Sequence, residues 1–475
     1  MEIKCLQFNE LSRESLRDEH LQKALKRIYE RLGIARNRAF SSLENPEALR
    51  DQAYRIKKKT LDRLDQYLEK LEEQVTRLGG KVHWASDAAR AREIIEALAE
   101  ERHVKTIVKG KSMFSEEIGL NESLINRGIE VYETDLGEYI VQLAGEPPSH
   151  IVGPAIHKTK EQISRLFSEN LGVERLEDPR DMTMLARKVL RREFLKADMG
   201  ITGVNFAVAE TGTIVLFENE GNIRMSTTLP HVHVAIMGIE KVVPTLEDLG
   251  ILMKLLVRSA TGQKMSTYVS MINGPKGEGD IDGAREFHLV IIDNGRSRIL
   301  SDPEERDTLH CIRCGACQNI CPVYLKIGGH AYGWIYSGPI GAILTPQIIN
   351  RKEASKLPYA STLCGACADI CPVRIDHPSI LLALRRKYAE DPEWQDTASL
   401  LEKGVIRLSS GVLKRKTLYK WGSRAARIAQ RFMTGLVSKT GFLLPKKIAD
   451  RIARVQPFGR KNFRQLWKAM SKEKI

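Results

Sequence analysis

The chain has 475 residues, of which 42% are hydrophobic and 28% charged, and this composition is typical of a globular protein with more than one domain. It contains no apolar run of 18 residues, which argues against a membrane-spanning helix, and its polar N-terminal segment lacks the apolar core of a secretory signal. The net charge of +14 is concentrated in residues 401–475, which hold 20 Lys and Arg against three acidic residues. We therefore expect a cytoplasmic protein with a basic C-terminal segment.

The first 78 residues have apolar side chains at helical spacing. A long helical pattern begins at Asn45, which is suited to cap a helix, with Pro46 in the first turn. It stops at Gly79 and Gly80, where glycine favours the end of a helix. These features predict an N-terminal helical segment.

From residue 79 to 300, short apolar runs alternate with helical patterns. The predicted strands lie at 81–85, 104–110, 129–135, 232–243 and 287–293, with two further strands within 205–219. A β-α-β-α-β order gives parallel strands with helices on both faces. We therefore predict an α/β domain with an open, mostly parallel sheet.

Seven of the eight cysteines lie between positions 311 and 371. Clustered thiols in a large chain without a signal sequence indicate metal binding rather than a disulfide framework. The first four have the spacing C-x2-C-x2-C-x3-C-P, typical of bacterial ferredoxin-type iron–sulfur sites: Cys311, Cys314, Cys317 and Cys321.

The second motif repeats this spacing with one change, because Ser361 stands at the position of Cys311. In two-cluster ferredoxins the cysteine before the proline ligates the other cluster. By this rule the predicted ligands of a first 4Fe-4S cluster are Cys311, Cys314, Cys317 and Cys371, and those of a second are Cys321, Cys364 and Cys367. The fourth ligand of the second cluster stays open between Ser361, solvent and a partner group, and a three-iron cluster is a further alternative.

Zinc is the competing interpretation, because two C-x2-C pairs can form a tetrahedral thiolate site. Zinc would leave three of the seven cysteines unused and would not account for Pro322 and Pro372, so iron–sulfur is favoured. The 42 residues between the motifs exceed a compact ferredoxin hairpin and predict an α-helical ferredoxin-like domain at 301–390. Cys5 is interpreted as a buried apolar residue rather than a ligand.

The two cysteine motifs, together with residues 203–249, resemble the lactate utilization protein B family. The resemblance implies two 4Fe-4S clusters and an electron-transfer role in bacterial oxidation of L-lactate to pyruvate. It also implies a complex with two sister proteins, one of them cysteine-rich and similar to heterodisulfide reductase subunits. The α/β domain would be similar to the sugar-phosphate isomerase and CoA-transferase fold. In that family the second motif also has three cysteines, so Ser361 agrees with the family pattern.

No catalytic residue is predicted, and whether the chain is itself an enzyme stays open. The alternative function is a self-sufficient enzyme whose α/β domain transforms a small acid or CoA ester, with Glu210 as nucleophile. An ordinary hairpin turn is the favoured interpretation of Glu210. His231 and His233 suit a metal pair on one strand face, but no third ligand is evident.

Residues 391–475 predict a basic helical tail. We interpret it as a docking segment for an acidic partner or for the inner face of a membrane. It has no recognisable nucleic-acid motif, so no nucleic acid is expected. The predicted domains are therefore 1–78, 79–300, 301–390 and 391–475.

Overall fold

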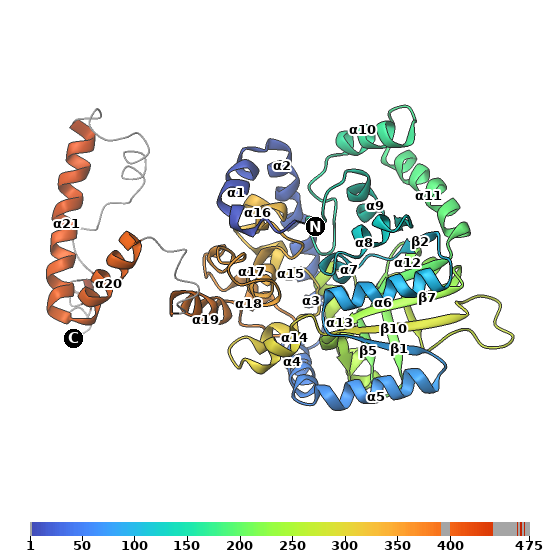
Figure 1. Cartoon of the computed structure of the whole chain (residues 1–475). Helices are drawn as coiled ribbons and strands as arrows, with labels where there is room; N and C mark the ends of the chain where they lie inside the picture. Colours follow the sequence, from blue (N-terminus) through green and yellow to red (C-terminus); the bar gives the residue numbers. More distant parts are fainter. Residues whose placement is uncertain (1, 391–399, 440–462, 464–465, 468–469, 471–475) are drawn as a thin grey trace. The chain divides into compact units, whose positions relative to one another are not determined.

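The computed structural model describes residues 2–390, 400–439 and four single residues beyond them, Phe463, Leu466, Trp467 and Met470. The chain forms two compact units, Met1–Asp391 and Pro392–Ile475. The second unit contains helices α20 (Leu400–Lys414) and α21 (Lys416–Lys439) (Figure 1). Within the described ranges, no helix is both long and apolar enough to cross a membrane.

A six-stranded parallel sheet forms the core of the α/β region within the first unit (Figure 1). Its strands are, in spatial order, β1 (Lys81–Ala85), β10 (Glu286–Ile292), β7 (Val232–Gly238), β4 (Met199–Gly203), β2 (Thr106–Lys109) and β3 (Glu130–Glu133). Every residue of β7 is buried, as expected for a strand covered on both faces. The predicted α/β class with an open parallel sheet is thus confirmed.

A second, four-stranded sheet was not predicted as a separate layer. Its order is β8 (Val242–Val243), β5 (Phe206–Val208), β6 (Thr213–Glu218) and β9 (Tyr268–Ile272). The predicted hairpin at 205–219 exists, with β5 and β6 antiparallel, but it belongs to this sheet rather than to the parallel one. Gly212 turns between the two strands with φ +69°, and a Cβ there would lie 2.9 Å from the backbone of Gln74.

Eight helices accompany these strands. They are α6 (Ala88–Glu101), α7 (Met113–Glu117), α8 (Leu120–Asn126), α9 (Leu136–Leu143), α10 (Lys160–Leu171), α11 (Pro179–Lys196), α12 (Asn222–Thr228) and α13 (Leu246–Ala260). Thr159 and Gln162 form a capping box at the start of α10, so two backbone amides of the first turn are satisfied reciprocally. The parallel sheet is therefore covered by helices, which explains why its strands are rich in apolar residues.

The N-terminal helices pack against both neighbouring parts of the first unit. They are the short η1 (Cys5–Gln7), α1 (Phe8–Arg17), α2 (Glu19–Ile28), η2 (Tyr29–Gly33), α3 (Ile34–Ser41), α4 (Pro46–Asp62) and α5 (Leu64–Arg77). The side chain of Asn45 accepts a hydrogen bond from Ala48 N at 3.0 Å and caps α4, as predicted. Helices α1 and α2 contact the cysteine-bearing region. Helix α4 contacts η4 of that region as well as α13 and β8, and α5 contacts β1 and β8. The N-terminal segment therefore joins the two regions.

The cysteine-bearing region consists of short helices joined by loops, and a helical region was expected. It contains α14 (Arg296–Ser301), η4 (Arg306–His310), α15 (Ala316–Ile320), α16 (Tyr324–Ile327), η5 (His330–Tyr332), α17 (Gly338–Ile348), η6 (Leu357–Tyr359), α18 (Ala366–Ile370) and α19 (His377–Glu390). Its buried side chains share one hydrophobic core with the N-terminal helices and the second sheet. This shared core holds the cysteine loops in a fixed environment.

Candidate functional site

The two cysteine motifs have the same local backbone conformation. The sulfur of Cys311 accepts a hydrogen bond from Arg313 N at 3.4 Å, and the hydroxyl oxygen of Ser361 accepts one from Leu363 N at 3.1 Å. Arg313 and Leu363 both have left-handed backbones, with φ 59° and 54°. The Ser361 oxygen therefore holds the same place in its loop as the Cys311 sulfur does in the first.

Each loop continues through a glycine into a five-residue helix. Gly315 and Gly365 have φ +71° and +84°, a conformation that favours glycine, and α15 and α18 follow directly. The two helices contact each other. The repeat in the sequence is thus a repeat in structure, with the motifs side by side.

Four cysteines from both motifs line a single small cavity: Cys311, Cys314, Cys317 and Cys371. The remaining wall is largely apolar and includes Ile151 and Ile340. Cys314, Cys317 and Cys371 are each less than a tenth exposed, while Cys311 is half-buried. Burial raises the pKa of Cys314 to about 12, and the neighbouring Cys371 thiol adds to the effect. The last cysteine of the second motif therefore lies with the first three of the first motif.

The other three cysteines lie near one another. Burial raises the pKa of Cys367 to about 12, with a further contribution from the Cys321 thiol. Burial also raises the pKa of Cys321, and the nearby Cys364 thiol contributes. Cys364 itself is exposed, and a hydrogen bond from the Thr362 side chain lowers its pKa. This second set is therefore open to solvent on one side.

The spread of the sulfurs does not match a single zinc ion. Tetrahedral zinc with bonds of about 2.3 Å needs sulfur atoms about 3.8 Å apart. Within the part of the chain that the structure describes, no three cysteine sulfurs all lie within 4.8 Å of one another. Three His and Glu side chains do meet this distance: Glu146, His157 and His330. A larger, polynuclear group fits this thiol set better than a mononuclear site.

The Glu146, His157 and His330 group is held by protein partners. His157 Nε2 lies 2.8 Å from the Glu146 carboxylate, whose other oxygen accepts from Lys158 Nζ at 2.7 Å. His330 Nε2 donates to the Pro147 carbonyl at 2.8 Å. These contacts join the loop after α9 to η5, which is a structural role.

Two arginines from the N-terminal helices bind the end of α18. Arg50 Nε donates to the carbonyl of Cys371 at 3.0 Å, and its Nη2 donates to the carbonyl of Asp369 at 2.5 Å. Arg36 Nη2 donates to the carbonyl of Ile370 at 2.9 Å. The last carbonyls of a helix have no partner within the helix, so these arginines satisfy them. They also bring two positive charges beside a buried set of thiols, where thiolates are otherwise costly.

Sequence reasoning missed both arginines. Arg50 is 5% exposed and lies on the same face of α4 as the buried Ala53 and Ile56. A charged residue at an apolar position of a helix is the signal that could have identified it.

Cys5 and Glu210 lie outside the two cysteine sets. Cys5 is fully buried, and its burial raises its pKa to about 12. The exposed Glu210 carboxylate accepts from Leu246 N at 3.2 Å, at the first residue of α13. Glu210 therefore stabilises a helix terminus, as expected for a turn residue rather than a nucleophile.

The two histidines near β7 do not form a metal pair. His231 is exposed, whereas His233 is buried with its Nε2 2.7 Å from the hydroxyl of Thr202. The pKa of His233 is lowered to about 3 by burial, so it is neutral at physiological pH.

Comparison with known proteins agrees with this arrangement. A family profile described as LUD domain matches residues 68–292, and one described as 4Fe-4S dicluster domain matches residues 307–375. A parallel-sheet LUD domain with a dicluster domain after it defines an iron–sulfur protein.

Curated relatives cover nearly the whole chain. "Lactate utilization protein B" of Shouchella clausii is 46% identical over 88% of this chain and 87% of its own. The protein of the same name from Bacillus cereus (strain AH820) and the "Uncharacterized electron transport protein YkgF" of Escherichia coli are each 45% identical over 90% of this chain and 89% of their own. The chain belongs to the lactate utilization protein B family.

One solved structure, that of a DUF162 family protein from Deinococcus radiodurans, covers 48% of this chain and 98% of its own, with 15% identity and a TM-score of 0.28. This likeness is too low to add to the assignment.

Proposed function

We propose that this protein is an iron–sulfur electron carrier in the oxidation of L-lactate to pyruvate, and that it works as one subunit of a multi-protein complex. The observation that carries the proposal is the placement of the seven cysteines as two adjacent sets within one compact unit. The names of the relatives, which refer to lactate utilization and electron transport, support it.

The proposed ligands follow from these two sets. Cys311, Cys314, Cys317 and Cys371 would hold the first 4Fe-4S cluster, a choice supported by the cavity that they share. Cys321, Cys364 and Cys367 would hold the second, with the Ser361 oxygen at the position of a fourth ligand. Such clusters accept and release single electrons.

Neighbouring side chains determine the charge and the solvent access at each cysteine set. Arg36 and Arg50 offset the negative charge of the buried thiolates, and the apolar wall keeps water out. The exposed Cys364 gives the second set a direct route to a partner surface. We therefore propose that electrons are exchanged with a partner at the Cys364 side, while the buried set is reached only through the protein.

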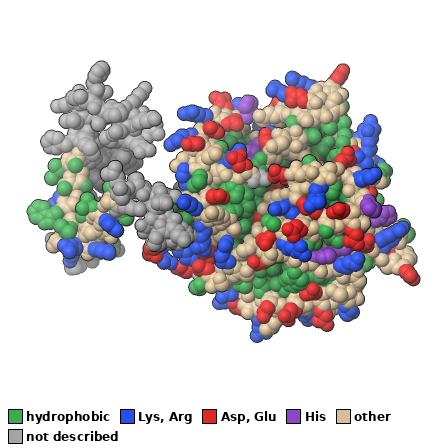
Figure 2. Space-filling model, in the orientation of Figure 1, with side chains coloured by type: hydrophobic (Ala, Val, Ile, Leu, Met, Phe, Trp, Pro, Cys, Tyr) green, Lys and Arg blue, Asp and Glu red, His purple; other side chains and the backbone are tan. Residues whose placement is uncertain are grey.

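The partners that we propose are the two sister subunits, one of them cysteine-rich, and a docking surface for the basic tail. On α20 and α21, large apolar side chains are exposed among Lys and Arg: Val405, Ile406, Leu408, Leu413, Trp421 and Ile428 (Figure 2). Such helices suit an acidic partner or an anionic lipid surface on the inner face of a membrane. Co-purification with the sister subunits tests the first surface, and flotation with anionic vesicles tests the second. Reversing the charges of α21 should abolish whichever of the two is observed.

Anaerobic purification tests the central claim. We expect about eight irons and eight acid-labile sulfides per chain if two four-iron clusters form. L-Lactate added to the co-purified complex should produce the EPR signals of reduced clusters. Stoichiometric zinc without sulfide would contradict the proposal.

A further inference from the structure

A candidate ligand site outside the cysteine sets is a cavity of about 340 Å³ in the α/β region. Its floor is formed by the carboxyl ends of parallel strands, with Gly203 at the end of β4, Gly238 at the end of β7, and Lys111 shortly after β2. Ligands of open parallel sheets bind at this edge. The volume lies at the lower end of the range for small-molecule pockets.

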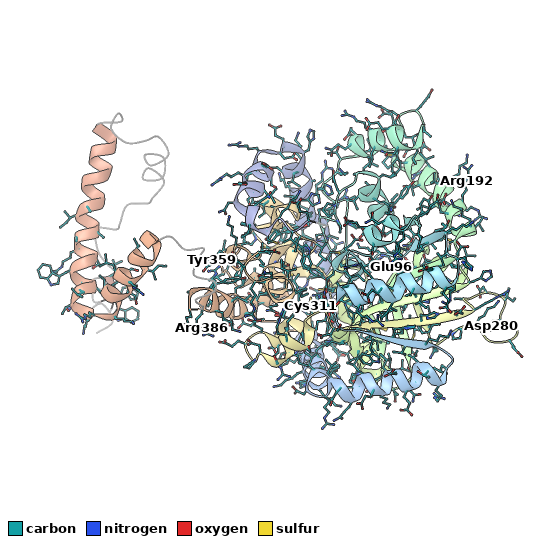
Figure 3. All side chains as sticks on the ribbon, in the orientation of Figure 1. Glu96, Arg192, Asp280, Cys311, Tyr359 and Arg386 are labelled. Carbon is teal, nitrogen blue, oxygen red and sulfur yellow. The ribbon has the colours of Figure 1, made fainter. Side chains whose placement is uncertain are left out.

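The cavity is closed on one side by the cysteine-bearing region. Arg313 and Tyr336 both line it, and Arg313 lies between Cys311 and Cys314 in the chain. Figure 3 shows Cys311 where the cysteine-bearing helices meet the α/β region. The same loop therefore touches a candidate cluster site and a candidate ligand site.

Two positive side chains in this cavity lack a full set of partners. Arg313 is stacked on Tyr336, with its guanidinium 4.7 Å from the ring centre, and its Nη2 lies 3.6 Å from Glu240. Its Nη1 is buried and has no hydrogen-bond partner among the described residues. Lys241 is 8% exposed, and its side chain makes no hydrogen bond or ion pair with any residue that the structure describes. Buried donors without partners are costly, so a ligand anion would stabilise this end.

The nearby carboxylates are shared between these two groups and other cations. The Glu240 carboxylate lies 2.7 Å from Arg296 Nε, so it forms an ion pair with Arg296 in addition to its contact with Arg313. Glu117 makes a two-pronged ion pair with Arg296 at 2.7 and 2.8 Å. Lys57, also buried, donates to the carbonyl of Glu240. Arg296, Arg313 and Lys241 thus share the charges of Glu117 and Glu240, while Lys57 is held by a backbone carbonyl.

Another part of the lining is acidic. It includes Asp135 and Glu220, and burial together with the Asp135 charge raises the pKa of Glu220. A second negative charge on a ligand would be repelled there. The cavity therefore suits one carboxylate at the cationic end and an uncharged polar group at the acidic part.

We propose that this cavity binds a small monocarboxylate, with the carboxylate on Lys241 and Arg313. Arg313 N also donates to the sulfur of Cys311, so ligand binding at Arg313 would change the environment of the buried cysteine set. The choice of L-lactate and pyruvate as probes rests on the proposed function, whereas the charge of the ligand rests on the cavity alone.

The test uses the full-length protein purified anaerobically with its clusters. Calorimetry should show binding of L-lactate or pyruvate, and little binding of neutral lactamide or of the dicarboxylate succinate. Lys241→Met should weaken that binding at least about tenfold, the usual loss for a charged hydrogen bond. Ligand addition should shift the EPR spectrum of the first cluster, and this shift should be absent in Lys241→Met.

Lys254→Met is the matched control, because Lys254 is exposed on α13 and does not line the cavity. It should bind like the unsubstituted protein. Unchanged binding in Lys241→Met overturns the proposal. So does a protein with full iron content that binds no carboxylate at millimolar concentration, because Lys241 and Arg313 would then serve only to offset cluster charge. Binding without any iron or sulfide would instead overturn the proposed function and leave the cavity proposal standing.

Discussion

The two cysteine sets have the same loop but different surroundings. Cys311 and Ser361 accept the same backbone hydrogen bond, and a glycine with positive φ follows in each loop. Yet the first set is enclosed, whereas in the second Cys364 is exposed. Local sequence therefore determines the loop, and distant parts of the chain determine how far each site is shielded from solvent.

The residues that enclose the first set come from every part of the first unit. Arg36 and Arg50 come from the N-terminal helices, and Ile151 comes from the loop after α9. Beside the second motif, Tyr359 is 57% exposed at the surface (Figure 3). A covered site and an accessible one suit storage of an electron and its exchange with a partner.

Loss of one thiol should have the largest effect. Cys314→Ser should remove about four irons and the EPR signal of the first cluster, because a buried ligand is lost. Cys371→Ser should give the same result, since both residues line one cavity. Cys364→Ser should instead remove the second signal and leave the first. Iron analysis and EPR check this, and a matching effect of Cys371→Ser and Cys364→Ser would refute the crossover.

The second-largest expected difference between the two cysteine sets is in the alkylation rates of their thiols. In chelator-treated, cluster-free protein, Cys364 is exposed with a lowered pKa, whereas the pKa of Cys314 is about 12. The thiolate is the reactive form, so at pH 8 Cys364 should be alkylated at least about 100-fold faster. The alkylation rate of Cys364 should level off at a lower pH than that of an ordinary thiol, whereas that of Cys314 should keep rising up to about pH 12. Mass spectrometry of iodoacetamide-treated samples measures both, and similar rates would count against the difference in environment.

The arginine contact should have an intermediate effect. Arg50→Gln leaves the carbonyls of Asp369 and Cys371 without their donors, so we expect a loss of about 1–3 kcal/mol in the free energy of unfolding. Removing the positive charge should also lower the reduction potential of the first cluster. Anaerobic denaturant titration and redox titration measure these effects.

Arg374→Gln is the control for Arg50→Gln. Arg374 is about one-third exposed and pairs with Glu47 and Asp51 at the surface, so its loss should cost no more than about 1 kcal/mol. Equal effects of the two substitutions would show that the buried contact has no special role.

Substitution of Ser361 should have the smallest effect. Ser361→Ala should leave the first cluster intact and change, at most, the EPR signal of the second. Ser361→Cys should give that cluster a fourth thiolate, because the side chain already has the position of Cys311 in its loop. Loss of both clusters in Ser361→Ala would contradict the assignment.

The cysteine spacing predicts two ligand sets, because ligand geometry is local and repeated, and in the structure Cys371 lines one cavity with Cys311, Cys314 and Cys317. The apolar runs of β7 and β10 likewise predicted buried parallel strands. β4 was missed because its sequence, MGITG, is rich in glycine. A Cβ at Gly200 would lie 1.8 Å from the carbonyl of Ser226, so close packing against α12 requires glycine there.

The contacts that distinguish the two sites could not be predicted from a local pattern. Arg50 and Cys371 are separated by 321 residues, and neither sequence neighbourhood indicates the other. The cavity is also formed by distant segments, since Lys241 and Arg313 meet only after the sheet and the cysteine region have packed together.

The distance in sequence between Arg50 and Cys371 also determines when, during translation, the buried cysteine set can be completed. At roughly 5–20 residues per second, a ribosome needs about 16–64 s to pass from Arg50 to Cys371. The N-terminal helices thus emerge long before the last thiol of the buried set. Cluster delivery to that set must therefore follow the synthesis of nearly all of the first unit, and the carrier that donates the cluster meets a chain whose other folding is well advanced.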